Sequence, residues 1–340
     1  MSERLSDKVR EFLKSAEGRE VDLAYLRREL RIDPNSAADV NLRKLMSETL
    51  VAEKIVKPSG RRDGVYRVVQ QFRPVRVFSP DRQRRSLFTL KFPRDSKSGN
   101  QIAIAESIII REGDLISIGG VKNKGKTLLC LLFAAENINL KPVLMGNEYT
   151  IFTDNDYEPA PRFLSRLDRM ADWVTWTDKD GYDRFTLLPV TSDYAEHVEQ
   201  NKLNIIDWIN LDGNELYNIS KVLGGIKSAL GRGVAIVALQ KSEAALNPRG
   251  GQFVRDFSDL EILLDGYGDN EDDILLTVKG AKEVKGRVVG KSFVYRIVEG
   301  GTQIYNFREV KKCALCHGTG YKGGATCGDC GGKKYVDTAF

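Results

Sequence analysis

Gly120-Val-Lys-Asn-Lys-Gly-Lys-Thr127 is the stretch that decides the fold of this 340-residue chain. It reads G-x4-G-K-T, a pattern in which glycines let the backbone curl so that its N–H groups point at phosphate oxygens. Residues 115–118 before it are apolar and predict a buried strand. Residues 127–136 after it are apolar nearly all round, contain no Gly or Pro, and predict a buried helix. Because the loop and both flanks agree, we interpret the stretch as a phosphate-binding loop and not as a glycine-rich surface turn.

The loop predicts ATP and Mg²⁺ as ligands. The N-terminus of the following helix adds unpaired N–H groups and the positive end of a helix dipole. Lys126 is expected to reach the β- and γ-phosphates, and the hydroxyl of Thr127 is expected to ligate Mg²⁺. The residues expected to bind nucleotide in this stretch are Gly120, Val121, Lys122, Asn123, Lys124, Gly125, Lys126, Thr127 and Leu128.

Three polar residues follow predicted buried strands further along the chain. Glu148 comes just after the strand at 143–145, where a carboxylate could polarise a water for attack on the γ-phosphate. Asp207 ends the strand at 203–207 and could hold Mg²⁺ directly or through a water. Gln240 ends the strand at 233–240 and could sense the γ-phosphate. Each residue alone also fits an ordinary loop or strand end, but the glycine loop upstream favours the catalytic and metal-binding roles.

Residues 102–307 resemble the RecA-like ATPases, in particular replicative DNA helicases of the DnaB class and their phage relatives. The matching segments are the glycine loop, Asn147-Glu-Tyr149, Asn204-Ile-Ile-Asp207, Ala238-Leu-Gln240 and Arg255-Asp-Phe-Ser-Asp-Leu260. The resemblance implies an α/β fold with a mostly parallel sheet flanked by helices. It also implies that Lys126 and Thr127 bind nucleotide and Mg²⁺, that Glu148 activates water, that Asp207 supports the metal, and that Gln240 is a switch.

The same resemblance implies a cationic finger supplied by a neighbouring subunit near the late strands. The chain offers Lys279, Lys282 and Arg287 there, without the Lys-x-Arg pattern of the family, so the assignment stays open. Three further strands are expected in this region, at 260–264, 274–278 and 293–297. The preceding loop, residues 241–256, is rich in Gly, Arg, Lys and Ser and is expected to be a flexible DNA-contacting loop that uses Arg249 and Arg255.

Residues 1–70 resemble a winged-helix domain in pattern. Apolar residues at helical spacing predict helices at 4–16, at 22–30 and from about residue 35, followed by a hairpin over 53–69 with a basic tip. In that family the third helix can enter the major groove while the wing touches the DNA backbone. The expected contacts are Arg43, Lys44, Arg61 and Arg62, with nucleic acid and protein left equally open as partners. This front end differs from the helical N-terminal domain of bacterial DnaB.

Residues 71–101 are expected to form a basic linker, with phenylalanines interleaved among arginines and lysines. Such a mixture suits phosphate contacts and base stacking with single-stranded nucleic acid, and it equally suits a solvated linker that packs its aromatic rings on the next domain. The remaining expected elements are strands at 86–90, 102–110, 173–176 and 185–188 and helices at 161–170, 194–200 and 215–230.

Residues 308–340 carry the pattern C-x2-C-x10-C-x2-C, formed by Cys313, Cys316, Cys327 and Cys330. Each C-x2-C turn presents two thiolates to one ion, and two such turns complete a tetrahedral Zn²⁺ site. The first half is similar to the zinc module of DnaJ, while Lys334 stands where the second half should have its last glycine. His317 is available as a further ligand but is not needed. The module is too small to fold by core burial alone, so the zinc is expected to be structural, with DNA or protein as its partner.

Composition and charge are those of an ordinary soluble globular protein, with a net charge of +5 and five cysteines. No run of about twenty apolar residues is present, so no transmembrane helix or membrane partner is expected. The first residues lack a signal-peptide pattern, which predicts a cytoplasmic protein, in the host cytoplasm if the chain is viral. Cys130 lies in the apolar helix and is expected to be a core residue.

The sequence therefore predicts an ATP-driven motor on single-stranded DNA that works as a homo-oligomer, either a hexameric helicase or a filament, and that contacts replication proteins. Two alternatives stay open. One is a RecA- or RadA-like recombinase that forms filaments, and the other is an ATP-gated loader or regulator in which hydrolysis only switches states.

Overall fold

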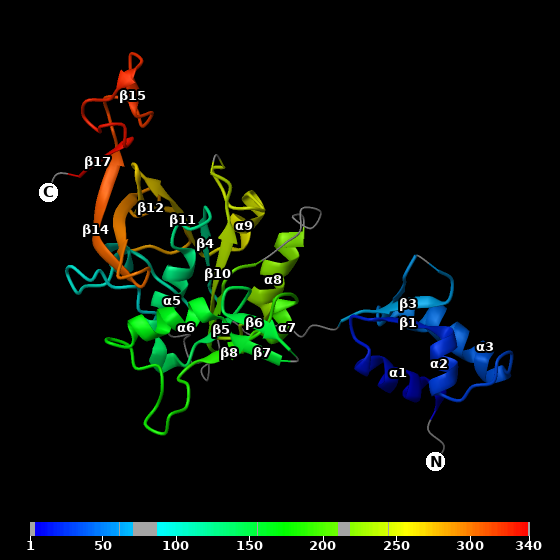
Figure 1. Cartoon of the computed structure of the whole chain (residues 1–340). Coiled ribbons are helices and arrows are strands. Elements are labelled where there is room, and N and C mark those ends of the chain that lie inside the picture. The colour runs from blue at the N-terminus through cyan, green and yellow to red at the C-terminus, as the bar shows by residue number, and fades with distance from the viewer. Residues whose placement is uncertain are drawn as a thin grey trace, which may run out of the picture. The chain divides into compact units, whose positions relative to one another are not determined.

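A computed structural model describes residues 4–60, 62–70, 87–154, 156–209, 218–243 and 245–338. The chain forms two compact units, residues 1–83 and 84–340 (Figure 1). Arg61 and most of the basic segment expected at 71–101, namely residues 71–86, lie outside the described residues. Among the residues described, none of the helices has the length and apolar character that a membrane span requires.

The described part of the first unit contains short helices and a three-stranded antiparallel sheet. Its helices are α1 (Leu5–Ser15), α2 (Leu23–Glu29) and α3 (Ala37–Lys44), the last continued by η1 (Leu45–Thr49) and α4 (Leu50–Ala52). The antiparallel sheet has the order β1-β3-β2, with β1 at Glu20–Asp22, β2 at Val56–Pro58 and β3 at Val65–Val68. Asp22 and Ser36 begin α2 and α3 because their side chains accept hydrogen bonds from backbone N–H groups of the first turn. The helices and hairpin were predicted, whereas the three-residue β1 was not.

The second unit is built on one ten-stranded sheet of order β17-β14-β13-β12-β11-β4-β10-β9-β5-β8. Its parallel part runs from β11 to β8, and its antiparallel part runs from β11 to β17. The parallel strands are β4 (Leu115–Gly120), β5 (Val143–Met145), β8 (Thr186–Leu188), β9 (Leu203–Ile206), β10 (Val234–Gln240) and β11 (Leu260–Tyr267). The other strands are β12 (Asn270–Ala281), β13 (Ser292–Val298), β14 (Gln303–Lys312) and β17 (Tyr335–Asp337).

Helices cover both faces of the parallel part because each central strand is apolar on both sides. Ile116 and Ile118 pack with α5 (Lys126–Glu136) and α6 (Pro161–Met170) on one face. Leu115 and Val237 pack with α7 (Tyr194–His197), α8 (Ile219–Ala229) and α9 (Gln252–Phe257) on the other. With β4 central and the glycine loop leading into α5, the RecA-like α/β core expected from the sequence is confirmed.

The smaller elements complete this unit. They are η2 (Ala103–Ser107), η3 (Ile138–Leu140), the hairpin of β6 (Thr150–Thr153) and β7 (Asp156–Pro159), and the hairpin of β15 (Tyr321–Lys322) and β16 (Ala325–Thr326). The hairpin β15–β16 belongs to the four-cysteine segment, which β17 attaches to β14 at the antiparallel end of the sheet (Figure 1).

Several expected elements differ in the structure. The strand expected at 102–110 is wrong, because residues Ala103–Ser107 form the 3-10 helix η2, and Ile104 on it and Ile102, Ile108 and Ile110 beside it are buried in the core. The strand expected at 173–176 is also wrong, because this segment turns back on α6 and Trp176 donates to the carbonyl of Leu167 at 3.1 Å. In the described residues 87–90 only an isolated bridge forms, between Leu87 and Arg111. The expected loop at 241–256 includes α9, and the helix expected at 215–230 is described from Asn218 onward as α8.

Candidate functional site

The glycine loop lies between β4 and α5 and is shaped for phosphate. Gly125 has φ +80°, and a Cβ there would lie 3.0 Å from the side chain of Ile297, so glycine suits this position in both conformation and space. Lys126, the first residue of α5, is buried, and its Nζ donates to the carbonyl oxygens of Gly120 at 3.0 Å and Val121 at 2.8 Å. Burial lowers the pKa of Lys126 while the charge of Asp207 opposes that shift. The ammonium is thus held at the loop by two neutral acceptors that a phosphate group could replace.

Asp207 lies at the end of β9, next to the loop. Its carboxylate is completely buried, and no hydrogen bond of ordinary geometry reaches either oxygen from the described residues, although Thr127 lies close enough to affect its ionisation. The pKa of Asp207 is raised to about 7, mainly by burial; the charge of Glu148 also raises the pKa, while Thr127 and Lys126 lower it. Two orphaned carboxylate oxygens beside a threonine hydroxyl are oxygen donors of the kind that Mg²⁺ takes, so the residues fit the expected ion.

Glu148 is placed by the backbone of Asp207. The amide N–H of Glu148 donates to the carbonyl of Asp207 at 3.2 Å, and the N–H of Asp207 donates to Met145 at 2.9 Å. Gly146 makes this approach feasible, since a Cβ on it would lie only 2.3 Å from the carbonyl oxygen of Asp207. The hydroxyl of Tyr149 beside this pair is fully buried and, in the described part of the chain, lacks a hydrogen-bond partner. Glu148 and Asp207 therefore lie just past the ends of the neighbouring strands β5 and β9.

Gln240 ends β10 beside the start of the glycine loop. Gln240 pairs in register with Gly120 across β10 and β4, and the N–H of Arg249 donates to its carbonyl at 2.8 Å. The next residue, Lys241, donates its N–H to the carbonyl of Gly120 at 2.9 Å and is itself only 4% exposed, with its Nζ paired to Asp265 of β11. The loop that begins after Gln240 is therefore anchored to the phosphate loop.

The sequence motifs did not predict the roles in the site of three residues, Lys241, Asp265 and Gly146. For Lys241 the available signal was its position directly after Gln240, and for Gly146 it was the glycine between a buried strand and Glu148. Nothing local marks Asp265, which joins Lys241 only because β11 and β10 flank β4.

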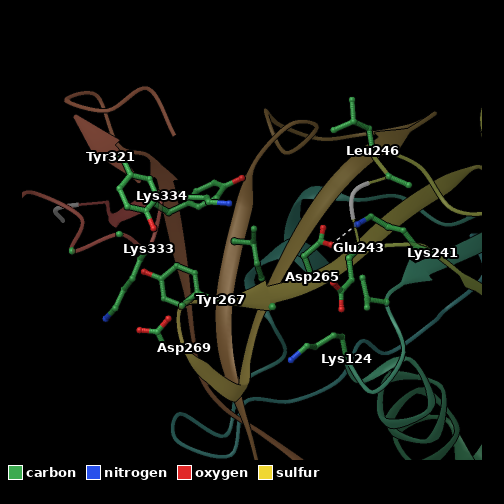
Figure 2. Close-up of a pocket in the computed structure, with 18 of the residues that line it drawn as sticks. Lys124, Lys241, Glu243, Leu246, Asp265, Tyr267, Asp269, Tyr321, Lys333 and Lys334 are labelled. Carbon is green, nitrogen blue, oxygen red and sulfur yellow. Dashed lines mark hydrogen bonds and ion pairs between the residues drawn. The ribbon is translucent and has the colours of Figure 1, made fainter. Parts of the chain in front are cut away.

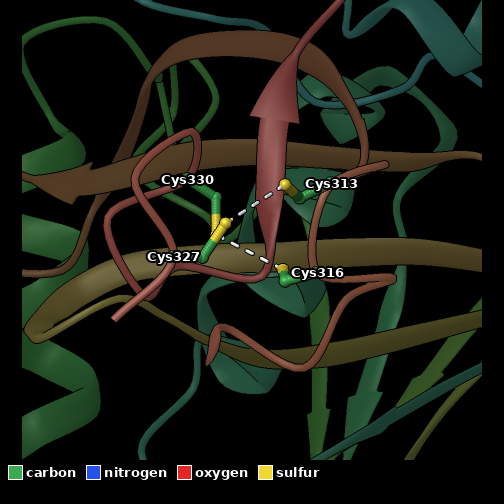
Figure 3. Close-up of side chains that lie close together, drawn as sticks. All are labelled: Cys313, Cys316, Cys327 and Cys330. Atoms are coloured by element: carbon green, nitrogen blue, oxygen red, sulfur yellow. Dashed lines mark hydrogen bonds between the residues drawn. The ribbon is translucent and has the colours of Figure 1, made fainter. Parts of the chain in front are cut away.

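The four cysteines come together as the spacing predicts (Figure 3). All are buried, their sulfurs lie within 4.8 Å of one another, and the distances Cys313–Cys327 and Cys316–Cys330 are 3.7 and 3.6 Å. Four sulfurs bound at ~2.3 Å to one tetrahedral ion lie ~3.8 Å apart, so the geometry is compatible with Zn²⁺. The N–H of Gly320 donates to the sulfur of Cys316 at 3.3 Å, as expected around a thiolate. His317 is exposed and outside the cluster, whereas Cys130 is a buried core residue.

No known family model matches the sequence, and no curated protein matches it. Solved structures that are similar include a RadB recombinase, with 16% identity, 62% of this chain and 95% of that chain covered, and a TM-score of 0.41. A KaiC-like protein from Pyrococcus horikoshii OT3 has 15% identity, with 63% and 98% covered and a TM-score of 0.42. The strand order and the glycine loop by themselves establish the fold of this chain.

The cations expected to contact nucleic acid have different surroundings. Arg43 donates to the buried carboxylate of Asp39 at 2.7 Å, and Arg255 donates to Glu261 at 3.2 Å, so both are held in place while half exposed. Lys44, Arg62 and Arg249 are exposed, and among the described residues no acidic group pairs with them. Of the three residues expected to supply the cationic finger, Lys282 pairs with Asp259 at 2.9 Å. Lys279 and Arg287 are therefore the remaining candidates for the finger.

Proposed function

We propose that this chain is an ATP-dependent nucleic-acid motor, and specifically a phage-type replicative DNA helicase that hydrolyses ATP to translocate on single-stranded DNA. The observation that carries the proposal is the convergence of Lys126, Thr127, Glu148, Asp207 and Gln240 at the carboxyl ends of adjacent parallel strands, the edge at which such sheets place their sites.

The catalytic step assigned to this edge is the attack of a water on the γ-phosphorus of ATP. Lys126 leaves its two carbonyl acceptors for the β- and γ-phosphates, where it balances the charge of the reacting group. Glu148 accepts the proton of the water as its oxygen bonds to phosphorus and the bond to the ADP oxygen breaks. Asp207 and Thr127 would hold Mg²⁺, which when bound would shield the phosphate charge.

The proposed link to DNA is the segment that follows Gln240. Its start is bonded to Gly120 through Lys241, and its return at Arg249 is bonded to Gln240. A change at Gln240 on loss of the γ-phosphate is therefore transmitted to a segment that presents the exposed Arg249 and the half-exposed Arg255. This anchoring supports a nucleotide-dependent grip on DNA.

The assembly we infer is a homo-oligomer in which Lys279 or Arg287 of one subunit reaches the ATP of the next. The first unit is proposed to bind DNA or a replication protein through Lys44 and Arg62, together with Arg43. The four cysteines are proposed to hold one structural Zn²⁺ per chain.

The test measures the affinity of a fluorescent oligo(dT) by anisotropy, together with ATP hydrolysis. We expect tighter binding with a non-hydrolysable ATP analogue than with ADP, an affinity that falls steeply with salt, and faster hydrolysis when DNA is present. Arg249→Glu with Arg255→Glu should weaken binding and stimulation while basal hydrolysis persists. The matched control is Lys141→Glu with Lys179→Glu, which makes the same change in charge. Both lysines are exposed and precede β5 and β8, on the side of the amino ends of the parallel strands. Absence of both binding at low salt and stimulation would replace the motor with a partner-regulated switch.

A further inference from the structure

A groove of about 670 Å³ separates the four-cysteine segment from the phosphate loop (Figure 2). One wall is formed by Tyr321, Lys333 and Lys334 of the cysteine segment. The opposite wall is formed by Lys124 of the phosphate loop and by Lys241 and Asp265. The groove therefore joins two parts of the sequence that are about two hundred residues apart and that the ATPase site does not otherwise connect.

Backbone hydrogen bonds to the clustered cysteines hold the groove wall of the cysteine segment in place. The carbonyl of Lys334 accepts from the N–H of Cys313 at 2.9 Å, and the N–H of Lys333 donates to Cys330 at 3.0 Å. Tyr321 belongs to β15, which pairs with β16 just before Cys327. Lys333 and Lys334 are exposed, and Tyr321 is 61% exposed. These side chains are consequently positioned by the cluster and open to a ligand.

The inner wall is part of the nucleotide machinery. Lys241 is buried against Asp265 and bonded through its N–H to Gly120, while Lys124 donates to the carbonyl of Glu271 at 3.0 Å. A ligand in the groove would therefore contact the same loop that surrounds the phosphates of ATP.

The chemistry of the lining decides the class of ligand. Pockets for free small molecules are mostly apolar, whereas this groove carries four lysines and has an exposed tyrosine at its outer side. Lysines beside a free aromatic face are what a single strand uses, through phosphate contacts and base stacking. Three carboxylates, Glu243, Asp265 and Asp269, also line it, and one of them is already paired with Lys241.

We propose that this groove binds single-stranded DNA, with a base stacked on Tyr321 and phosphates held by Lys333 and Lys334. This inference rests on the proposed function. It makes the groove a second DNA-contacting surface, in addition to the segment after Gln240. The zinc module is then the outer wall of the DNA path and not an independent appendage.

The test uses the full-length, zinc-loaded protein and anisotropy of fluorescent oligo(dT) across a salt series. Tyr321→Ala should weaken DNA binding about fivefold or more. Tyr321→Phe should keep the wild-type affinity, because stacking needs the ring and not the hydroxyl. Lys333→Glu with Lys334→Glu should weaken binding and lower the slope of log Kd against log salt by about 1.4, since two phosphate contacts are lost. The matched control is Lys311→Glu with Lys322→Glu, which changes two exposed lysines of the same region that do not line the groove. Zinc content and basal ATP hydrolysis should be unchanged in every variant.

Two results would overturn the groove assignment while leaving the motor intact. One is wild-type DNA affinity in both Tyr321→Ala and the Lys333–Lys334 double variant. The other is a raised KM for ATP with unchanged DNA affinity, which would assign the groove to the free nucleotide. If the wild-type protein hydrolyses ATP but binds no oligonucleotide, the groove assignment and the proposed function fall together.

Discussion

Lys126 and Lys241 share one hydrogen-bond acceptor, the carbonyl oxygen of Gly120. The Nζ of Lys126 lies 3.0 Å from it, and the backbone nitrogen of Lys241 lies 2.9 Å from it. If a phosphate drew Lys126 away, the carbonyl of Gly120 would keep its bond to the backbone of Lys241. The residue proposed to bind ATP and the segment proposed to grip DNA are therefore connected through one peptide group.

Glu148→Gln should separate ATP binding from ATP hydrolysis. The amide keeps the size of the side chain but cannot accept a proton, so we expect hydrolysis to fall by about 10²- to 10⁴-fold with nucleotide affinity retained. Single-turnover hydrolysis and binding of a fluorescent ATP analogue measure the two quantities. Wild-type turnover in this variant would remove Glu148 from the active site.

Gly146→Ala should disrupt the site through sterics alone. The added Cβ would lie 2.3 Å from the carbonyl of Asp207, so either the Glu148 loop or the end of β9 must move. We expect a loss of about 3 kcal/mol or more in the free energy of unfolding, together with loss of hydrolysis. Gly181→Ala is the matched control, because Gly181 also has positive φ but has no atom within 4 Å of the added Cβ. Equal denaturation midpoints for the two variants would show that the predicted clash is absent.

Asp207 should make the Mg²⁺-free protein less stable as pH rises. Burial raises the pKa of Asp207 in the folded chain to about 7, from the ordinary value of 3.8 expected in the unfolded chain. The folded state therefore keeps the proton up to a higher pH than the unfolded state does. Its contribution to stability is therefore complete below about pH 4 and is lost as pH rises through about 7.

Asp207→Asn removes this titration. Without Mg²⁺ we expect it to raise Tm relative to wild type at pH 8 and to have little effect at pH 4.5. Stabilisation by Mg²⁺ and ATP should be smaller in the variant than in wild type. A Tm difference between the two proteins that does not change with pH would contradict the assigned burial of the charge.

Zinc binding should depend on the four clustered cysteines. Elemental analysis of protein purified without chelator should give one Zn²⁺ per chain, and Cys316→Ser should lower that content. Cys130→Ser should leave it unchanged, because Cys130 is buried in α5 and outside the cluster. Less than half an equivalent in the wild-type protein would refute the metal assignment.

The nucleotide site was largely predictable because its signals are local. The glycine loop is flanked directly by its apolar segments, and each polar residue lies at or just past the end of its own buried strand, at 143–145, 203–206 and 233–240. The isoleucines at 102–110 were misread because burial of Ile102, Ile104, Ile108 and Ile110 in the core produces an apolar pattern like that of a strand, although the segment contains the 3-10 helix η2.

The antiparallel end and the groove could not be predicted from local patterns. β14 has few fully buried residues, so its sequence looks mostly polar. The groove depends on β17 pairing with β14, which brings Lys333 and Lys334 to a wall opposite Lys124. This arrangement follows from the order of the strands in the sheet, and no short segment of the sequence predicts it.

ATP-dependent strand displacement tests the central claim most directly. A labelled strand annealed to a longer single strand is incubated with wild-type protein, with or without ATP, and with Lys126→Ala. We expect displacement only by the wild type with ATP, because Lys126→Ala should reduce hydrolysis by about 100-fold or more. Stoichiometric displacement without ATP, or hydrolysis that never displaces the strand, would contradict the proposal of a helicase.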